Sequence, residues 1–246
     1  MKQRLDRILV EKGLVLSRQK AQGHIMAGEV KVDGVVVTKA GSMVNDESKI
    51  EVVPGRIPFV SRGGLKLDAA LEHFQMDISG KVGMDVGAST GGFTDCLLQR
   101  GARKVYAVDV GYGLLDSHLR DDSRVVLVER TNFKYIERDA IAECIDIVTV
   151  DVSFISVTKI VPKALEFICN GGDIVLLVKP QFEVGKGQVG KGGIVRDVKK
   201  REEVVKRVED SMLDLGLESS GVFESPVKGQ KGNREYFMYL KRRENG

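Results

Sequence analysis

Short apolar runs alternate with longer polar, glycine-containing segments after residue 60. The stretches between most of these runs are long enough for helical crossovers, so the alternation predicts an α/β fold with a doubly wound, mostly parallel sheet. The turn at 228–233 is too short for a crossover, so the last strand is expected to pair antiparallel with its predecessor. The predicted strands are 81–86, 105–110, 124–128, 145–151, 173–179, a strand around Val222, and 235–240.

The first 53 residues follow a different pattern. An apolar stripe predicts a helix over 3–12, and Ser17 and Gly28 are expected to begin and end a second helix. The segments 29–37 and 50–53 indicate short strands, the first containing a tight turn. Prolines mark the linker, because they disfavour regular structure. We therefore predict a small α+β domain over 1–53, an interdomain linker over 54–62 and a larger domain over 63–246.

The net charge of +3 is distributed unevenly along the chain. Residues 1–60 hold ten Lys/Arg against seven Asp/Glu, and the remainder holds 28 of each. This asymmetry favours an amino-terminal module that binds a polyanion, although ordinary surface solvation would also account for it.

Other features exclude several classes of protein. The longest apolar runs are far shorter than the roughly 20 residues that span a bilayer, and charges interrupt the amino-terminal segment where a signal peptide would be apolar, so we expect a cytoplasmic protein. The cysteines Cys96, Cys144 and Cys169 are widely spaced in apolar surroundings, and we interpret them as buried thiols. The three histidines are equally scattered, and no metal site is expected.

The strongest local signal is the glycine-rich turn within 84–93, where an apolar strand leads into a helix expected to begin near Phe93. Ligands of open α/β sheets bind at this carboxyl edge. Asp109, at the end of the next strand, can accept hydrogen bonds from both hydroxyls of a ribose. The turn lacks the G-x-G-x-x-G spacing that seats a pyrophosphate, so the pattern indicates a nucleoside cofactor without phosphates.

Two motifs are misleading. Residues 87–91 match G-x-S-x-G, but the one downstream histidine, His118, comes too early for the Ser-Asp-His order of an α/β-hydrolase. Residues 185–191 match G-x-x-x-x-G-K, but Gly192 replaces the Ser/Thr that would hold magnesium. We interpret the second segment as a basic loop that closes on substrate.

Ionisable residues collect at the ends of the predicted strands, with one more in the helix before the first strand. Any one of them could be an ordinary surface ion-pair member. Taken together they resemble the catalytic tetrad of the FtsJ-type ribose 2′-O-methyltransferases, which matches here Lys66, Asp151, Lys179 and Glu235.

The resemblance extends over nearly the whole chain to one family, the TlyA-type rRNA methyltransferases, also called the hemolysin A family. Its GASTGGFT, DVGYG, ERTN, SFIS and KPQFEVGKGQVG signatures match residues 87–94, 109–113, 129–132, 153–156 and 179–190. The resemblance implies a Rossmann-like class I methyltransferase sheet, S-adenosyl-L-methionine as cofactor, and an RNA-binding domain of the type named after ribosomal protein S4. It also implies methylation of a cytidine ribose in large-subunit rRNA. Since the chain ends at Gly246 without the longer extension of dual-specificity members, we expect the large-subunit site alone.

Roles for individual residues follow from this resemblance. Lys179 is the expected partner of the attacking ribose oxygen, with Asp151 and Glu235 orienting the two lysines. The cofactor is expected to contact Asp85, Gly87, Ala88, Ser89, Thr90, Gly91, Gly92, Phe93, Asp109, Thr131, Asn132 and Asp151. Expected RNA contacts, through phosphates, are Arg4, Arg7, Arg18, Lys20, Lys31, Lys186 and Lys191.

Two other classes of function stay open at this point. A membrane-lytic protein would suit the family's second name, but it would need an apolar or strongly amphipathic segment. A non-catalytic RNA-binding module would bind cofactor without transferring a methyl group.

Overall fold

A computed structural model describes residues 2–53, 58–185, 189–190, 192–229 and 231–243. Its amino-terminal module is built from two helices and five short strands. The helices are packed together over a small apolar core that includes Leu5, Ile8 and Ile25. The elements are β1 (Lys2–Arg4), α1 (Leu5–Glu11), α2 (Arg18–Ala27), β2 (Val30–Val32), β3 (Val35–Val36), β4 (Met43–Asn45) and β5 (Ile50–Val52).

The module confirms the predicted hairpin and adds a strand pair that the pattern did not predict. Asp33 and Gly34 both have positive φ, as a two-residue hairpin turn between β2 and β3 requires. The first strand, β1, pairs antiparallel with β4, and α1 begins at Leu5 rather than at residue 3. β1 is only three polar residues long, so it has no apolar alternation to reveal it.

The larger domain contains one seven-stranded sheet with the order β11-β12-β10-β9-β6-β7-β8. β12 runs antiparallel to both of its neighbours, and the other strands are parallel, as predicted. The strands are β6 (Val82–Val86), β7 (Lys104–Val108), β8 (Val125–Val128), β9 (Ile145–Val150), β10 (Ile168–Val178), β11 (Leu217–Glu224) and β12 (Tyr236–Arg242).

Helices cover both faces of this sheet. α3 (Arg62–His73), α4 (Gly92–Gln99) and α5 (Ser117–Arg120) contribute to the apolar core on one face. α6 (Val161–Ala164) and α8 (Val198–Asp214) contribute to the core on the other face. Short turns complete the chain: η1 (Phe133–Tyr135), η2 (Arg138–Ala140), η3 (Val157–Lys159) and α7 (Pro180–Glu183).

The packing of the larger domain begins earlier than residue 63. Phe59 and Val60 pack against the core on the α3 face, and the Val60 amide donates to Asp95 Oδ2 at 2.7 Å. A Cβ on Gly64 would lie 2.3 Å from the Phe59 ring, so glycine permits this contact. Residues 59–62 therefore pack with the larger domain, and residues 54–57 of the predicted linker lie outside the described residues.

The prediction of three buried thiols is correct only for Cys96. Cys144, just before β9, and Cys169, in β10, form a disulfide near the surface, with their Cα atoms 5.4 Å apart. The starts of β9 and β10 are neighbours in the sheet, which brings together two residues that are 25 positions apart in sequence.

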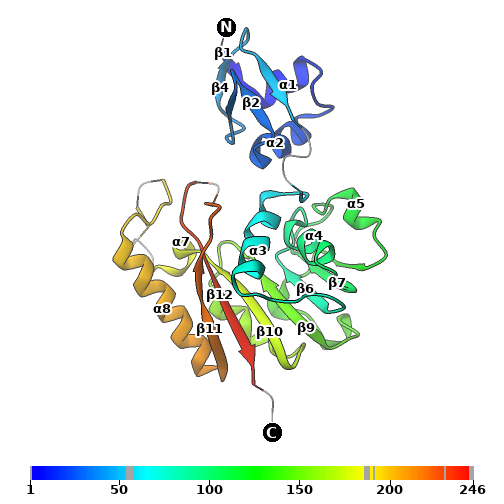
Figure 1. The fold of residues 1–246 in the computed structure, drawn as a ribbon, viewed down its shortest axis with the longest axis vertical. Coiled ribbons are helices and arrows are strands. Elements are labelled where there is room, and N and C mark those ends of the chain that lie inside the picture. The colour runs from blue at the N-terminus through cyan, green and yellow to red at the C-terminus, as the bar shows by residue number, and fades with distance from the viewer. Residues whose placement is uncertain (1, 54–57, 186–188, 191, 230, 244–246) are drawn as a thin grey trace.

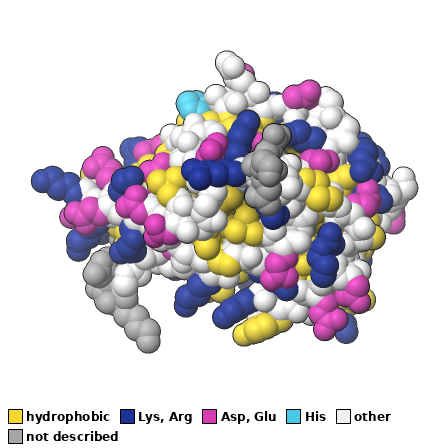
Figure 2. All heavy atoms as spheres, turned by 90° about the horizontal axis from the view of Figure 1, so that it is seen from below, with side chains coloured by type: hydrophobic (Ala, Val, Ile, Leu, Met, Phe, Trp, Pro, Cys, Tyr) yellow, Lys and Arg dark blue, Asp and Glu magenta, His cyan; other side chains and the backbone are white. Residues whose placement is uncertain are grey.

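Figure 1 shows the amino-terminal module on the side of the sheet toward which β10 runs, opposite the end of β12. The carboxyl edge of the parallel strands therefore faces the module. The far end of the molecule carries basic and acidic side chains interspersed, in keeping with the balanced charge of residues 61–246 (Figure 2). Within the described residues, no helix is long and apolar enough to cross a membrane, and no group of His, Cys, Asp and Glu could hold a metal ion.

Candidate functional site

The glycine-rich turn lies at the carboxyl end of β6, as predicted. Gly87 has a φ of +89°, and a Cβ there would lie 2.7 Å from the Asp151 carbonyl oxygen. The amides of Gly87 and Ala88 both donate to the Val108 carbonyl, which ties the turn to β7. Gly91, with a φ of +96°, then leads into α4. Only glycine allows the backbone to approach β9 this closely.

Asp109 links the turn to the end of the neighbouring strand. Its Oδ2 accepts from the Ser89 amide at 2.9 Å, and its Oδ1 accepts from the Gly111 amide at 2.7 Å. Each carboxylate oxygen can accept more than one hydrogen bond, so both retain capacity for a ribose hydroxyl. Ser89 and Thr90 are exposed at the tip of the turn beside Asp109.

Two residues expected at the cofactor lie in the interior instead. Asp85, the last residue but one of β6, is fully buried and accepts from the Thr94 amide and hydroxyl at 2.9 and 2.8 Å. Burial, with a smaller contribution from the Asp151 charge, raises the pKa of Asp85 to about 7 against the opposing effect of the Thr94 hydrogen bonds. Phe93 is also buried and packs near Phe237, with ring centroids 6.1 Å apart. Both side chains pack beneath the glycine-rich turn, and neither lies on its surface.

Thr131 and Asn132 follow β8 on the same edge. The Thr131 amide donates to the Asp109 carbonyl, and its hydroxyl donates to the Glu129 carbonyl. Asn132 is exposed and caps η1, where its Oδ1 accepts from the Lys134 amide. The structure therefore ties Thr131 to Asp109 through the backbone and leaves the neighbouring Asn132 exposed at the same edge.

Lys179 and Asp151 form one ion pair of the predicted tetrad. They follow the neighbouring strands β10 and β9, and Lys179 Nζ lies 2.5 Å from Asp151 Oδ1. Lys179 Nζ also donates to Ser153 Oγ at 3.2 Å. The lysine side chain is largely buried, so these two oxygens fix the position of its amine.

Lys66 and Glu235 form the other pair. Lys66 lies in α3 and Glu235 directly precedes β12, and Lys66 Nζ lies 2.7 Å from Glu235 Oε2. The two side chains are only 12% and 4% exposed. A Cβ on Gly229 would lie 2.2 Å from Glu235 Oε1, so a glycine opposite the carboxylate gives it room.

The sheet brings these two pairs to the same edge. β9, β10 and β12 are consecutive strands, and Tyr236, next to Glu235, is paired with Val178, next to Lys179. Two lysines and two carboxylates from distant segments therefore converge beside the glycine-rich turn. Asp151, Lys179 and Glu235 were expected at this edge because each follows or opens a strand there, and Lys66 was expected with them from its place in the helix before the first strand.

The basic loop after α7 is only partly described. Lys186 and Lys191, expected to contact RNA, lie outside the described residues. The segment that follows the loop is held beside Glu235: Asn233 Oδ1 accepts from the Val195 amide at 3.1 Å, and Asn233 Nδ2 donates to the Gly193 carbonyl at 2.8 Å. Arg201 of α8 donates to the Val195 carbonyl and to the Tyr236 hydroxyl.

The amino-terminal candidates for RNA binding differ in their surroundings. Arg4 and Arg18 share one buried carboxylate, Asp6, at 2.8 and 3.1 Å. The structure therefore brings together two of the five candidates in the module, residues 14 positions apart in sequence.

The other three candidates lie apart from that cluster. Arg7 pairs with Glu11 on the exposed face of α1, at 2.8 Å. Lys31 lies opposite Glu51 across the β2–β5 pair, and Lys20 is exposed in the first turn of α2. Arg7 and Lys31 each have an acidic neighbour, which reduces the positive potential that they can offer a phosphate.

Phe154 is a residue of this edge that pattern analysis did not single out. It is 92% exposed, has a positive φ of +65°, and its ring centroid lies 5.0 Å from that of Phe182. Lys179 Nζ lies 6.0 Å from the Phe182 centroid. Strained backbone at an exposed aromatic residue clusters at functional sites. The SFIS signature contains Phe154, but apolar periodicity gives no reason to expect it on the surface.

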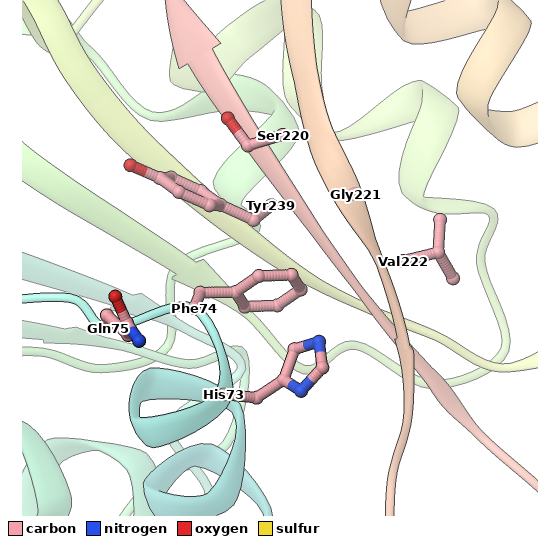
Figure 3. A pocket seen from close by; sticks show the side chains of 7 residues that line it. All are labelled: His73, Phe74, Gln75, Ser220, Gly221, Val222 and Tyr239. Carbon is pink, nitrogen blue, oxygen red and sulfur yellow. The ribbon is translucent and has the colours of Figure 1, made fainter.

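A hollow of about 320 Å³ lies elsewhere on the larger domain, between the end of α3 and the bulged edge strand β11. Figure 3 shows the His73 and Phe74 rings and Tyr239 around it. None of the tetrad residues lines it. Its lining residues are His73, Phe74, Gln75, Ser220, Gly221, Val222 and Tyr239.

An open α/β sheet with this strand order, a glycine-rich turn after β6 and an acidic residue after β7 defines a Rossmann-like domain, a class whose ligands bind at the carboxyl edge of the sheet. Comparison with protein families matches residues 59–242 to the FtsJ-like methyltransferases and residues 3–50 to the S4 domain. The chain belongs to the FtsJ-like methyltransferase family and, within it, to the TlyA or hemolysin A group.

Individual relatives agree with this assignment. The chain is 47% identical to the 16S/23S rRNA (cytidine-2′-O)-methyltransferase TlyA of Mycobacterium tuberculosis over 97% of this chain and 89% of that protein. It is 46% identical to Hemolysin A of Brachyspira hyodysenteriae over 96% and 99%. A solved structure of a hemolysin from Streptococcus thermophilus superimposes with a TM-score of 0.78 and 39% identity, over 98% of this chain and 89% of that one.

Proposed function

We propose that this chain transfers a methyl group from S-adenosyl-L-methionine to the 2′-hydroxyl of a cytidine ribose in large-subunit rRNA. The observation that carries the proposal is the convergence of Lys66, Asp151, Lys179 and Glu235 as two ion pairs beside the glycine-rich turn. The name of the M. tuberculosis relative supports cytidine and the 2′-oxygen as the target. The S4 domain supports an RNA substrate.

The residues at the edge suit a nucleoside cofactor. A Cβ on Gly87 would lie 2.7 Å from the Asp151 carbonyl oxygen, so glycine lets the turn lie directly against the residue that ends β9 and joins the tetrad. Asp109 can accept hydrogen bonds from the ribose hydroxyls, and Thr131 and Asn132 flank it. When bound, the cofactor supplies a methyl group that is activated by its positively charged sulfur. The protein must then align the acceptor oxygen and remove its proton.

Lys179 is the residue we assign to that proton. In its neutral form, Nζ would accept the proton of the ribose 2′-hydroxyl as that oxygen bonds the methyl carbon and the bond between this carbon and sulfur breaks, which leaves a neutral thioether. Asp151 lies 2.5 Å away and stabilises the ammonium that results. Ser153 keeps Nζ in place through the hydrogen bond at 3.2 Å. General-base contributions of this kind are typically about 10²–10⁴-fold.

The second ion pair positions the substrate. Glu235 holds Lys66 in one conformation, and the remaining N–H donors of Lys66 can bind the ribose or an adjoining phosphate. The exposed ring of Phe154 gives an unstacked base a surface to lie on, which suits the single-stranded or flipped nucleotides that RNA enzymes read.

Mapping of ribose methylation in rRNA tests the proposal. Cells that lack this chain are expected to lose 2′-O-methylation at one cytidine of large-subunit rRNA. Complementation with the natural chain restores the methyl group, and the Lys179→Ala variant does not. An rRNA map that is identical with and without the chain contradicts the proposal.

A further inference from the structure

The buried carboxylate of Asp6 is the most heavily hydrogen-bonded acidic group of the amino-terminal module. Arg4 donates from Nε to Oδ1 at 3.0 Å and from Nη2 to Oδ2 at 2.8 Å. Arg18 Nε and Gln22 Nε2 donate to Oδ2 at 3.1 and 3.0 Å. Asp6 has no exposed surface, so it cannot contact a ligand itself.

The two arginines held by Asp6 are open to solvent on their other side. The side chain of Arg4 is 47% exposed and that of Arg18 is 59% exposed. Among the hydrogen bonds of the described residues, Arg4 Nη1 and both terminal nitrogens of Arg18 donate none. Both guanidinium groups therefore present free donors although each is anchored at one edge.

The shared oxygen forces the two guanidinium groups close together. Arg4 Nη2 and Arg18 Nε are bonded to the same atom, so their separation cannot exceed the two hydrogen bonds placed end to end. Two cations this close would repel each other without the carboxylate. The Arg4 guanidinium, with smaller contributions from Gln22 and Arg18, holds the pKa of Asp6 well below its usual range against the effect of burial. Asp6 is therefore ionised at neutral pH.

The fold explains how distant residues reach this point. Arg4 ends β1 and precedes α1, while Arg18 is the first residue of α2, whose cap is Ser17. The first turn of α1 supplies Asp6 from the buried side of the module. The positive end of α2 lies beside the pair and adds to its attraction for an anion.

We infer that Asp6 is a positioning residue that holds Arg4 and Arg18 as a two-arginine clamp for one phosphate of the RNA backbone. The inference rests on the proposed function for the identity of the RNA. Two guanidinium groups with free, preoriented donors match the several acceptor oxygens of a phosphate, and their net charge with Asp6 is +1. Because the side chains are already fixed, little rotamer entropy is lost when phosphate binds.

Because Asp6 is charged, the clamp and simple electrostatics predict opposite changes in RNA affinity when Asp6 is replaced. Asp6→Asn adds one positive charge to the module, so long-range electrostatics alone predicts tighter RNA binding. The clamp predicts weaker binding, because the arginines lose their anchor. Glu47→Gln is the matched control, since Glu47 is exposed, makes no ion pair among the described residues and gives the same change in charge.

The experiment measures binding of the full chain to purified large-subunit rRNA over a series of salt concentrations. Arg4→Met and Arg18→Met each are expected to lower affinity at least fivefold and to reduce the slope of log K against log salt by about 1, the value for one phosphate contact. Asp6→Asn is expected to lower affinity about tenfold and to reduce the slope as well. Glu47→Gln is expected to leave the affinity within twofold of that of the natural chain and the salt slope unchanged.

Two further readouts separate positioning from folding. In the Arg4→Met/Arg18→Met background, Asp6→Asn is expected to have no additional effect on RNA affinity, because Asp6 acts through these arginines. Gln22→Met removes one donor to Asp6 without changing charge, and a two- to fivefold loss of affinity is expected. If thermal unfolding shows that Asp6→Asn does not fold, the RNA affinity of Gln22→Met tests the clamp in its place.

The outcomes distinguish the clamp from the proposed function. The clamp is overturned if Asp6→Asn binds RNA with natural or higher affinity. If Asp6→Asn does not fold, the clamp is overturned when Gln22→Met binds RNA with natural affinity. Neither result bears on methyl transfer. A chain that binds rRNA through the clamp but transfers no methyl group overturns the proposed function and leaves the clamp intact. Asp6→Asn is expected to raise KM for rRNA, while kcat, measured at saturating rRNA, stays unchanged.

Discussion

The carboxylate of Glu235 lies 2.7 Å from the ammonium group of Lys66, although the two residues are 169 positions apart in sequence. The pair joins α3, at the start of the larger domain, to β12, at its end. Both side chains are nearly removed from water, so neither charge can be left alone without a cost in stability.

Lys66→Met is expected to lower the free energy of unfolding by about 3–5 kcal/mol, because it leaves the Glu235 carboxylate buried without its partner. The double variant Lys66→Met/Glu235→Leu is expected to recover most of that stability, since an apolar pair of similar volume replaces both charges. Denaturant unfolding measures the stability, and methyl transfer is measured on the same samples. Full turnover by the double variant would show that the pair serves folding alone.

Lys179→Ala is expected to lose at least about 10²-fold in turnover, the lower end of a general-base contribution, while it still binds cofactor and rRNA. Lys179→Arg is expected to fail as well, because a guanidinium stays protonated and has a different shape. Lys206→Ala, on the exposed face of α8, is the control and should match the natural chain. Single-turnover methyl transfer at saturating rRNA and cofactor gives the rates. A Lys179→Ala rate within about threefold of the natural rate, far below that range, would remove Lys179 from the chemical step.

Asp109→Ala is expected to weaken binding of S-adenosyl-L-methionine by about 1–3 kcal/mol, the cost of leaving the polar partners of a removed acceptor unpaired. The affinity falls because the cofactor loses its hydrogen bonds to Asp109 and because the Ser89 and Gly111 amides lose the acceptor that positions the turn. Asp121→Asn, an exposed change after α5, is expected to leave affinity unchanged. Calorimetry measures both, and equal affinities for Asp109→Ala and the natural chain would exclude Asp109 from the cofactor site.

The stability of the fold is expected to fall as pH rises toward neutrality because of Asp85. Its pKa is about 7 in the folded state against about 3.9 for an ordinary aspartate, so the folded state binds this proton more tightly. The stability that this group contributes is complete below about pH 4 and is lost as pH rises through 7, by about 1.4 kcal/mol for each pH unit between these two values.

Asp85→Asn cannot ionise, and its side-chain oxygen can still accept from Thr94. Urea unfolding at pH 5 and pH 8 should therefore show a smaller loss of stability for Asp85→Asn than for the natural chain. Equal losses in the two proteins would contradict the raised pKa of Asp85.

The architecture of the larger domain could be predicted because its strands are continuous apolar runs. A parallel strand that is buried on both faces is apolar at nearly every position, so it is recognised in the sequence. A polar residue that directly follows such a strand lies at the carboxyl edge of the sheet. Lys179 and Asp151 were therefore expected together, and the structure places them 2.5 Å apart. The antiparallel last strand followed from the length of a single turn.

Features that depend on tertiary packing could not be predicted in the same way. Asp6 is one acidic residue in a charged segment, and only the meeting of β1, α1 and α2 shows that it is buried. Phe93 and Asp85 lie within the cofactor signature, yet both face the interior. The Cys144–Cys169 disulfide depends on the register of two strands, which composition does not contain.

The nucleoside product formed by the purified chain tests the proposed methyl transfer with the fewest intervening steps. Large-subunit rRNA from cells that lack the chain is incubated with it and with S-adenosyl-L-methionine carrying a labelled methyl group, then digested to nucleosides and analysed by mass spectrometry. We expect the label in 2′-O-methylcytidine, at one methyl group per rRNA, and no label with the Lys179→Ala variant. Label on a base, or no label in cytidine, would contradict ribose methylation by this chain.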